Sequence, residues 1–300
     1  MRLDPRISGA LAFAIATVQF TPALSRAEEG AEGITAVSSR VSKDYVRVML
    51  PDGSFQAEEY AFGEGGRLDG SFRDASIDKL KFLDIARVMA GPLAALHYRP
   101  ARGLDTEKLL IMVYWGTTIV PSTFSNSYAS QNYQDTMRSI GDAHLDVQRS
   151  YMLAAAAEIP LEMESSQRNQ VDLRNSLLLG YDSDVVTAAN YGANVGQIGV
   201  VGAHNDELLA EVEDARYFVV LLAYDFQVFR KENKHKLLWE TRFSIDEAHN
   251  DFAKALPVMA QYASKYFGQD SHGLLRTKVP EGKVLMGEPK SLGQVEMPVK

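Results

Sequence analysis

The clearest pattern of hydrophobic and polar positions lies in residues 216–245, where two alternating segments flank a charged turn. Every even position is apolar over Phe218–Val228, and the odd positions are apolar as far as Ala223. Tyr217–Tyr224 is therefore predicted to be covered on both faces, because a strand with two apolar faces is normally buried between layers. The return segment alternates with a period of two, which completes the pattern of a β-hairpin.

The turn of this hairpin is expected at Lys231–His235, which contains no apolar residue. The preceding Asp225–Phe229 has one polar face and is expected to project beyond the covered part of the sheet. Trp239 lies on the apolar face of the return segment. We interpret it as a packing residue of the core rather than as a platform for a ligand.

A second apolar segment, Leu109–Trp115, is an unbroken run that predicts a fully buried central strand. Before it, helical spacing extends over residues 77–90, with Asp74 or Ser76 in position to cap the helix. Gly91-Pro92 is expected to break or kink that helix, because proline removes a backbone donor.

The central strand and the hairpin are separated by a predicted helical insertion at about residues 119–205. Helical spacing begins near Tyr133 and is expected to stop at Pro160, and a second, more polar helix is expected over residues 161–179. After the hairpin, the spacing over residues 252–267 predicts a closing amphipathic helix.

These elements together predict an α/β (α+β) fold: a mixed β-sheet with a C-terminal β-hairpin, helices packed on the sheet, and the helical insertion. Residues 28–268 are expected to form one domain, for which 46% hydrophobic content is ample. Within it, residues 28–42 are small and polar and are interpreted as a flexible leader. Residues 269–300 lack a core pattern and are expected to be an extended or disordered tail.

Residues 1–27 have the order of a secretory signal peptide. A basic start precedes a mostly apolar run, Ile7–Phe20, and the small residues Ser25 and Ala27 stand at −3 and −1 of a cleavage point. The protein is therefore expected to be exported, to the periplasm or to the outer membrane. No other stretch approaches the ~20 apolar residues of a membrane span, so none is expected in the mature chain.

Net charge and the absence of cysteine exclude several kinds of partner and site. The formal net charge is −8, and removal of residues 1–27 would make it two units more negative. Nucleic acid is an unsuitable partner for such a chain, since phosphate binding depends on clustered lysine and arginine. There is no cysteine, which excludes disulfides, thiolate metal sites, a cysteine nucleophile and a lipid-modified cysteine.

The best position for a ligand pocket is the carboxyl end of the central strand, where ligands sit in open α/β sheets. Tyr114, Trp115 and Thr117 lie there, and Glu64 and Arg67 lie in a nearby glycine-rich stretch. These five residues are the candidate ligand-binding residues. The alternative is structural: the two aromatic residues close the core, and the glycine-rich stretch is a surface turn with a local ion pair.

No catalytic residue, cofactor or metal is expected from the motifs. The six histidines show no HExxH spacing, and the chain contains neither a GxSxG elbow nor a phosphate-binding glycine loop. Asp182-Ser-Asp184 matches a metal-binding DxD pattern, but a helix cap is the favoured interpretation.

The order of elements and two hairpin motifs carry a resemblance to a known family. Val219–Asp225 and Leu237-Leu-Trp239 resemble the strand pair of the DUF4136-type envelope proteins of Gram-negative bacteria. The match covers about half of the chain, which departs from the family by its helical insertion and by having no lipidation cysteine. The resemblance implies a compact sheet-and-helix fold in the envelope and no catalytic residues.

Three functions follow as hypotheses. The first is a non-enzymatic module that binds or scaffolds an envelope protein or outer-membrane component. The second is a hydrolase-type enzyme whose site lies between the end of the strand at 109–115 and the stretch at 63–67. The third, an exported solute-binding protein, is ranked last because the chain shows no two-lobed repeat. The oligomeric state does not follow from the sequence.

Overall fold

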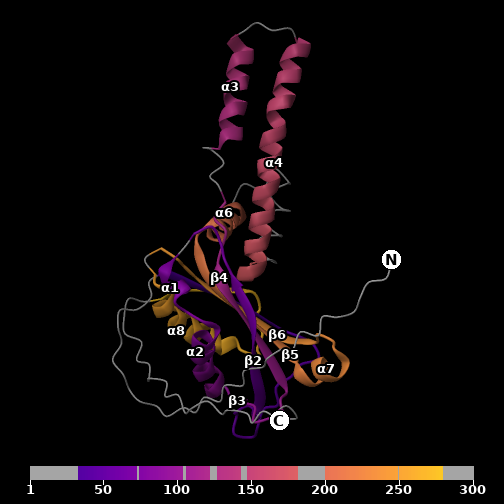
Figure 1. Cartoon of the computed structure of the whole chain (residues 1–300), viewed down its shortest axis with the longest axis vertical. Coiled ribbons are helices and arrows are strands. Elements are labelled where there is room, and N and C mark those ends of the chain that lie inside the picture. Colours follow the sequence, from indigo (N-terminus) through magenta and orange to yellow (C-terminus); the bar gives the residue numbers. More distant parts are fainter. Residues whose placement is uncertain are drawn as a thin grey trace, which may run out of the picture.

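The structure is a computed structural model that describes residues 33–72, 74–103, 106–121, 127–142, 147–181, 200–248 and 250–279. The predicted signal peptide and the Asp182-Ser-Asp184 motif lie outside the described residues. Within them, the chain forms an α/β fold with seven α-helices and a seven-stranded mixed sheet (Figure 1). This confirms the predicted fold class.

The sheet has the strand order β3-β2-β4-β5-β6-β1-β7. Strands β3, β2 and β4 are parallel to one another, whereas every other neighbouring pair is antiparallel. The strands are β1 Gly33–Val41, β2 Glu58–Leu68, β3 Tyr98–Pro100, β4 Leu109–Thr117, β5 Arg216–Asp225, β6 Leu237–Asp246 and β7 Leu274–Val279.

Helices cover both faces of this sheet. The larger core lies on the face occupied by α2 and α8, and the smaller core lies under the end of α4 and under α6. The helices are α1 Ala75–Asp78, α2 Phe82–Ala95, α3 Tyr128–Asp142, α4 Val147–Leu179, α6 Val200–Glu213, α7 Phe226–Glu232 and α8 Phe252–Ala263, followed by the 3-10 turn η2 Ser264–Tyr266.

The two strands that dominate the sequence pattern lie side by side in the middle of the sheet. β4 coincides with the predicted central strand and pairs with β5 along its whole length. Alternate residues of β5 enter opposite cores: Tyr217 and Val219 face α8, whereas Phe218 and Val220 face α6. The predicted coverage of β5 on both faces is thereby confirmed for its first half, and the pairing of β5 with β6 confirms the hairpin.

The connection between β5 and β6 differs from the prediction. The strand ends at Asp225, and residues 226–232 form helix α7 in place of a projecting strand end. The carboxylate of Asp225 accepts a hydrogen bond from the backbone N–H of Val228 at 3.0 Å, which caps the helix. Asn233 closes it in the left-handed conformation. Alternating apolar residues do not distinguish a strand end from such a short capped helix.

The predicted flexible leader at residues 28–42 is wrong for its described part. Residues 33–41 form β1, which lies between β6 and β7 inside the sheet. Its small polar side chains Thr35, Ser38 and Ser39 are buried, and the Oγ atom of Ser39 donates a hydrogen bond to the carbonyl oxygen of Tyr266 at 2.9 Å. A strand that buries small polar residues has no apolar run in the sequence. It is therefore recognised only from its pairing with β6 and β7.

Two helices continue where proline was expected to end or kink them. α2 extends through Gly91-Pro92 to Ala95, and α4 runs without a break through Pro160. A proline removes one backbone hydrogen bond and its ring crowds the preceding turn. Apolar packing on both sides offsets this cost in α2, where Met89 and Leu93 are both fully buried. Pro257 likewise lies inside α8.

The predicted tail at residues 269–300 begins with an ordered edge strand. Its described part includes β7, an extended segment that pairs antiparallel with β1. Residues 280–300 lie outside the described residues. Tyr45–Leu50, a segment with strand-like alternation, contributes only an isolated bridge between Met49 and Phe55.

The packing of Trp239 gives a test of the larger core. Its side chain is fully buried and stacks on Phe267 with ring centroids 6.2 Å apart. We expect Trp239→Ala to lower the free energy of unfolding by about 3–5 kcal/mol, because the substitution leaves a large cavity. Leu237→Ala on the same strand is the control: this side chain is 37% exposed, so its loss should cost well under half of that. Urea denaturation measures both, and equal losses would contradict the assignment of Trp239 to the core.

Candidate functional site

The five predicted ligand-binding residues lie on two adjacent parallel strands, β2 and β4. Arg67 is in register with Trp115, and Glu64 is in register with Val113, so these side chains lie on the same face as the larger core. Tyr114 packs against the smaller core on the opposite face. The structure therefore brings Arg67 close to Trp115 but separates Tyr114 from both.

Trp115, Arg67 and Thr117 have structural roles in the described contacts. Trp115 is 3% exposed and belongs to the larger core. Arg67 forms ion pairs at 2.6 Å with Asp69 and with Asp78 of α1. Thr117 is buried, and its Oγ1 atom accepts a hydrogen bond from the backbone N–H of Gly70 at 2.8 Å. Glu64 is exposed. Ligand binding by the five residues stays a prediction.

The glycine-rich stretch is part of strand β2 rather than a loop. A bulge between Glu64 and Gly66 shifts its register against β4. A Cβ atom added at Gly65 would lie 2.5 Å from the ring of Tyr114, and one at Gly63 would lie 2.3 Å from the sulfur of Met112. At Gly65 a side chain would meet the aromatic ring of Tyr114, which lies over the backbone of β2, whereas at Gly63 it would meet the flexible end of Met112, which can move aside.

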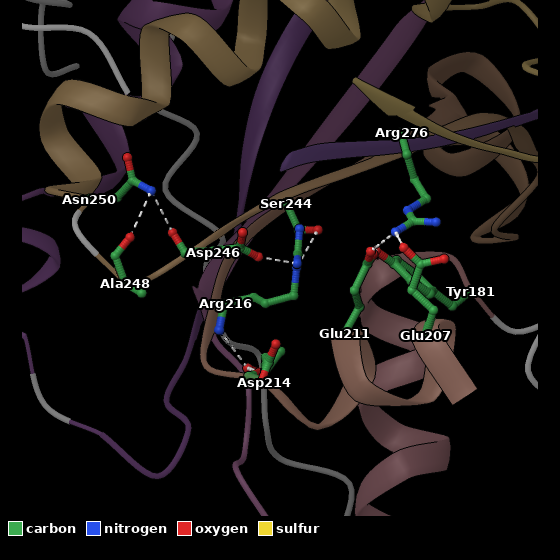
Figure 2. A network of polar contacts seen from close by, with 11 residues as sticks. Tyr181, Glu207, Glu211, Asp214, Arg216, Ser244, Asp246, Ala248, Asn250 and Arg276 are labelled. Carbon is green, nitrogen blue, oxygen red and sulfur yellow. Dashed lines mark hydrogen bonds and ion pairs between the residues drawn. The ribbon is translucent and has the colours of Figure 1, made fainter. Parts of the chain in front are cut away.

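A polar network that the sequence patterns did not predict closes the same end of the sheet. It is centred on Arg216, the first residue of β5, which is completely buried. Figure 2 shows its guanidinium group beside Ser244 and Asp246 of β6. Nη1 pairs with the carboxylate of Asp246, and Nε donates to the hydroxyl of Ser244 at 3.2 Å.

The start of β5 is joined to the end of β4 through Thr118. Its hydroxyl donates to the carbonyl oxygen of Asp214 at 2.8 Å and accepts from the backbone N–H of Arg216 at 2.9 Å. Burial raises the pKa of the Asp214 carboxyl, and the nearby charge of Asp246 raises it further. A charged residue next to a strand with two apolar faces was the sequence signal for this network, since a buried charge needs a partner.

A second part of the network attaches α6 to the edge strand β7. The guanidinium group of Arg276 on β7 pairs with Glu207 and with Glu211 of α6 (Figure 2). The hydroxyl of Tyr181, which follows α4, donates to Glu211 at 2.5 Å. These contacts connect α4, α6 and β7 through the Arg276 guanidinium and the Glu211 carboxylate. Their arrangement is that of a structural clamp.

The lower half of α4 is held in place by the same kind of contacts. Arg168 binds Glu213 through two nitrogens at 2.8 and 2.5 Å. The side-chain amide of Asn175 donates to the carbonyl oxygens of Ile119 and Val212 at 2.7 and 2.9 Å, and its oxygen accepts from Ile119 N–H at 3.2 Å. A buried amide with all these partners fixes the direction in which α4 leaves the sheet.

The upper half of α4 runs beside α3 and projects away from the sheet (Figure 1). We call this part, α3 together with residues 147–163 of α4, the arm. Large apolar side chains on the arm are exposed to solvent rather than packed. They are Tyr128 84%, Tyr151 75%, Met152 65%, Leu153 42%, Ile159 57% and Met163 61% exposed. A group of exposed large apolar residues on one segment favours a binding surface.

The described residues contain no group of three or more histidine or acidic side chains that could hold a metal ion. His97, His235 and His272 are the histidines whose surroundings are described, and the ring of His235 packs between Tyr224 and Phe229. None of the described helices has the length and apolar character needed to cross a membrane.

No family model and no curated protein matches the sequence. Three solved chains match the structure, among them the crystal structure of a PDZ domain protein from Parabacteroides distasonis. The sequence identity is 11% and the TM-score is 0.36, over 82% of this chain and 39% of that chain. The chain thus spans about two fifths of that protein's length. A likeness at this level carries no argument about function.

The buried carboxylate of Asp172, at the base of the arm, gives a pH-dependent test. Burial, and next the charge of Glu213, raise the pKa of Asp172 to about 6. An unfolded aspartate has a pKa of about 3.9, so the folded chain holds this proton more tightly and loses stability as the pH rises from about 4 to about 6. Asp172→Asn removes that loss and should stabilise the protein at pH 7, by on the order of 1 kcal/mol.

Urea denaturation of Asp172→Asn and of the wild type at pH 4 and pH 7 measures this difference. The matched control is Asp135→Asn on α3, where the carboxylate is 74% exposed and pairs with Arg138. The control should not change the pH dependence. A stability gain for Asp172→Asn that is the same at both pH values would contradict the assignment.

Proposed function

We propose that the protein is a non-enzymatic, exported module of the cell envelope that binds or scaffolds another envelope component through its arm. The observation that carries the proposal is the group of exposed large apolar side chains on the arm, five on α4 and Tyr128 on α3, in a pair of helices directed away from the sheet. Exposing such side chains to water is unfavourable, and contact with a partner would remove that cost.

The geometry of the arm supports a role in contacts between molecules. Its base is fixed by the bonds of Asn175 and by the Arg168–Glu213 pair, so the arm is presented in one direction. A surface that is rigid before binding loses less conformational entropy when a partner binds. By contrast, Arg67 and Thr117, which lie where an enzymatic site was predicted, are engaged in ion pairs and a hydrogen bond within the sheet domain.

The export part of the proposal rests on the sequence of residues 1–27, with its basic start, apolar run and small residues before the cleavage point. The periplasm or the outer membrane is the proposed location. The resemblance of the hairpin to the DUF4136-type envelope proteins supports the same compartment. The proposal includes no cofactor, metal or nucleic acid.

A photo-crosslinking amino acid at Tyr151, on the arm, tests the binding role in living cells. We expect it to form an adduct with a specific envelope component, identified by mass spectrometry. The matched control is the same amino acid at Val46, which is 80% exposed but lies off the arm. If the two positions give the same adducts, or if the arm gives none apart from other copies of this chain, the arm does not carry the proposed function.

Export predicts a mature chain that begins at Glu28. N-terminal sequencing or intact-mass measurement of the protein from the periplasmic fraction checks this. Ala27→Tyr should block processing and leave the longer form, because the cleavage site requires a small residue at −1. An unprocessed wild-type protein in the cytoplasm would contradict the prediction.

A further inference from the structure

Helix α4 carries a second, mostly apolar pattern of positions that the described part of the chain does not bury. Eight positions follow one another at alternating steps of four and three residues, which is the spacing of core positions in a coiled coil. All eight are exposed. We call them the outer stripe: Met152, Ala156, Ile159, Met163, Ser166, Gln170, Leu173 and Leu177.

The opposite side of α4 has the same spacing and is already occupied. Ala157 is 4% exposed and Leu161 is half-buried on the part of α4 that runs beside α3. Further along this side, Arg168 and Asn175 bind α6 and the chain after β4. α4 therefore has two packing faces, and the described residues cover only one of them.

We propose that the outer stripe is a homodimer seam, in which α4 of one chain packs in parallel and in register against α4 of a second copy. The stripe extends over residues 152–177, a length of about 39 Å at 1.5 Å per residue. That is more than three heptads, the length over which such a pattern indicates a coiled coil. The seam gives the exposed face of α4 a partner. Any role of the dimer in scaffolding rests on the proposed function of the arm.

The order of residues along the stripe favours a second copy in parallel register. Ser166 and Gln170 form a polar section between apolar sections on either side. In parallel, in-register pairing each residue meets its own counterpart, so the polar section meets itself and the apolar sections meet each other. Antiparallel pairing about the middle of the stripe would place Ile159 against Gln170. A polar core position of this kind commonly sets the register of a coiled coil.

Charge favours another helix over a membrane surface. None of the eight positions of the stripe is charged, so two identical copies do not repel each other at the seam. α4 contains no lysine, and its acidic residues outnumber its arginines. Helices that lie on anionic membranes usually have a polar face rich in lysine and arginine. The charged residues of α4 are Arg149, Glu158, Glu162, Glu164, Arg168, Asp172 and Arg174.

Analytical ultracentrifugation of the purified mature chain tests the seam. We expect a dimer, and we expect Ile159→Glu and Met163→Glu to raise its dissociation constant by more than about tenfold, a change of roughly 1.4 kcal/mol. The matched control is Tyr151→Glu, which places the same charge on an exposed aromatic residue of α4 outside the stripe. It should leave the dimer intact. Circular dichroism should show that all three variants keep their helices.

The absence of cysteine allows a direct test of register. Met163→Cys and Gln170→Cys, made separately, should each form a disulfide-linked dimer on mild oxidation, because equivalent residues face each other at a distance that a disulfide can bridge. Glu158→Cys, which is exposed but outside the stripe, is the control. After the same oxidation it should run largely as a monomer on a non-reducing gel. Crosslinking of all three variants to the same extent would contradict the seam.

Three further results would overturn the inference: a monomer at high protein concentration, a dimer insensitive to both glutamate substitutions, or efficient crosslinking only in a mixture of Met152→Cys and Leu177→Cys chains. The last result would show antiparallel pairing. The proposed function is tested independently at Tyr151. A monomer that still forms arm adducts would remove the seam and keep the function, whereas a dimer without such adducts would do the reverse.

Discussion

The two apolar faces of β5 are the constraint on which the rest of the structure depends. Tyr217 and Val219 require cover on one side of the sheet, and Phe218 and Val220 require it on the other. The closing helix α8 and α2 cover the first face, and the second face is covered by α6 and the end of α4. Burial of the second face of β5 therefore requires α6 and the end of α4 to pack on the sheet, and the start of α4 lies beyond it.

Polar contacts convert this layer packing into a defined geometry. Arg216 starts the most buried strand, and its pairing with Asp246 joins β5 to β6 where both enter the core. The amide of Asn175 and the Arg168–Glu213 pair then set the direction of α4 relative to α6. Such buried groups are costly when unpaired, so they specify one arrangement even where they add little net stability. The direction of the arm is a consequence of that specificity.

This arrangement separates two roles along one helix. The lower half of α4 completes the core, whereas the upper half is held in solvent with α3 as its neighbour. The outer stripe crosses both halves, so a partner bound along it would contact the helix where it is rigidly anchored as well as where it projects. In the proposed scaffolding role, this anchoring would fix the position of the sheet domain relative to a partner bound to the arm.

Much of the central architecture was predictable from local patterns. Two-sided apolar spacing identified β5, an unbroken apolar run identified β4, and alternation around Trp239 identified β6. The candidate site was less predictable. Arg67 and Tyr114 were placed near each other along the strand direction, but their faces depend on a bulge at Glu64 that only the pairing of β2 with β4 reveals. The charge of Arg216 at the start of the most apolar strand predicted that it needs a buried partner. The sequence did not predict that this partner is Asp246.

The sequence by itself determined which segments must be buried, because hydrophobic periodicity is a local property of the chain. The tertiary structure decided the rest. Residues 33–41 became a strand because β6 and β7 supply its hydrogen bonds, and α2 continues past Pro92 with Met89 and Leu93, before and after it, both buried in the core. One face of α4 was used inside the domain and the other was left exposed for the same reason. Pairing and burial depend on residues far apart in the chain, and no local pattern contains them.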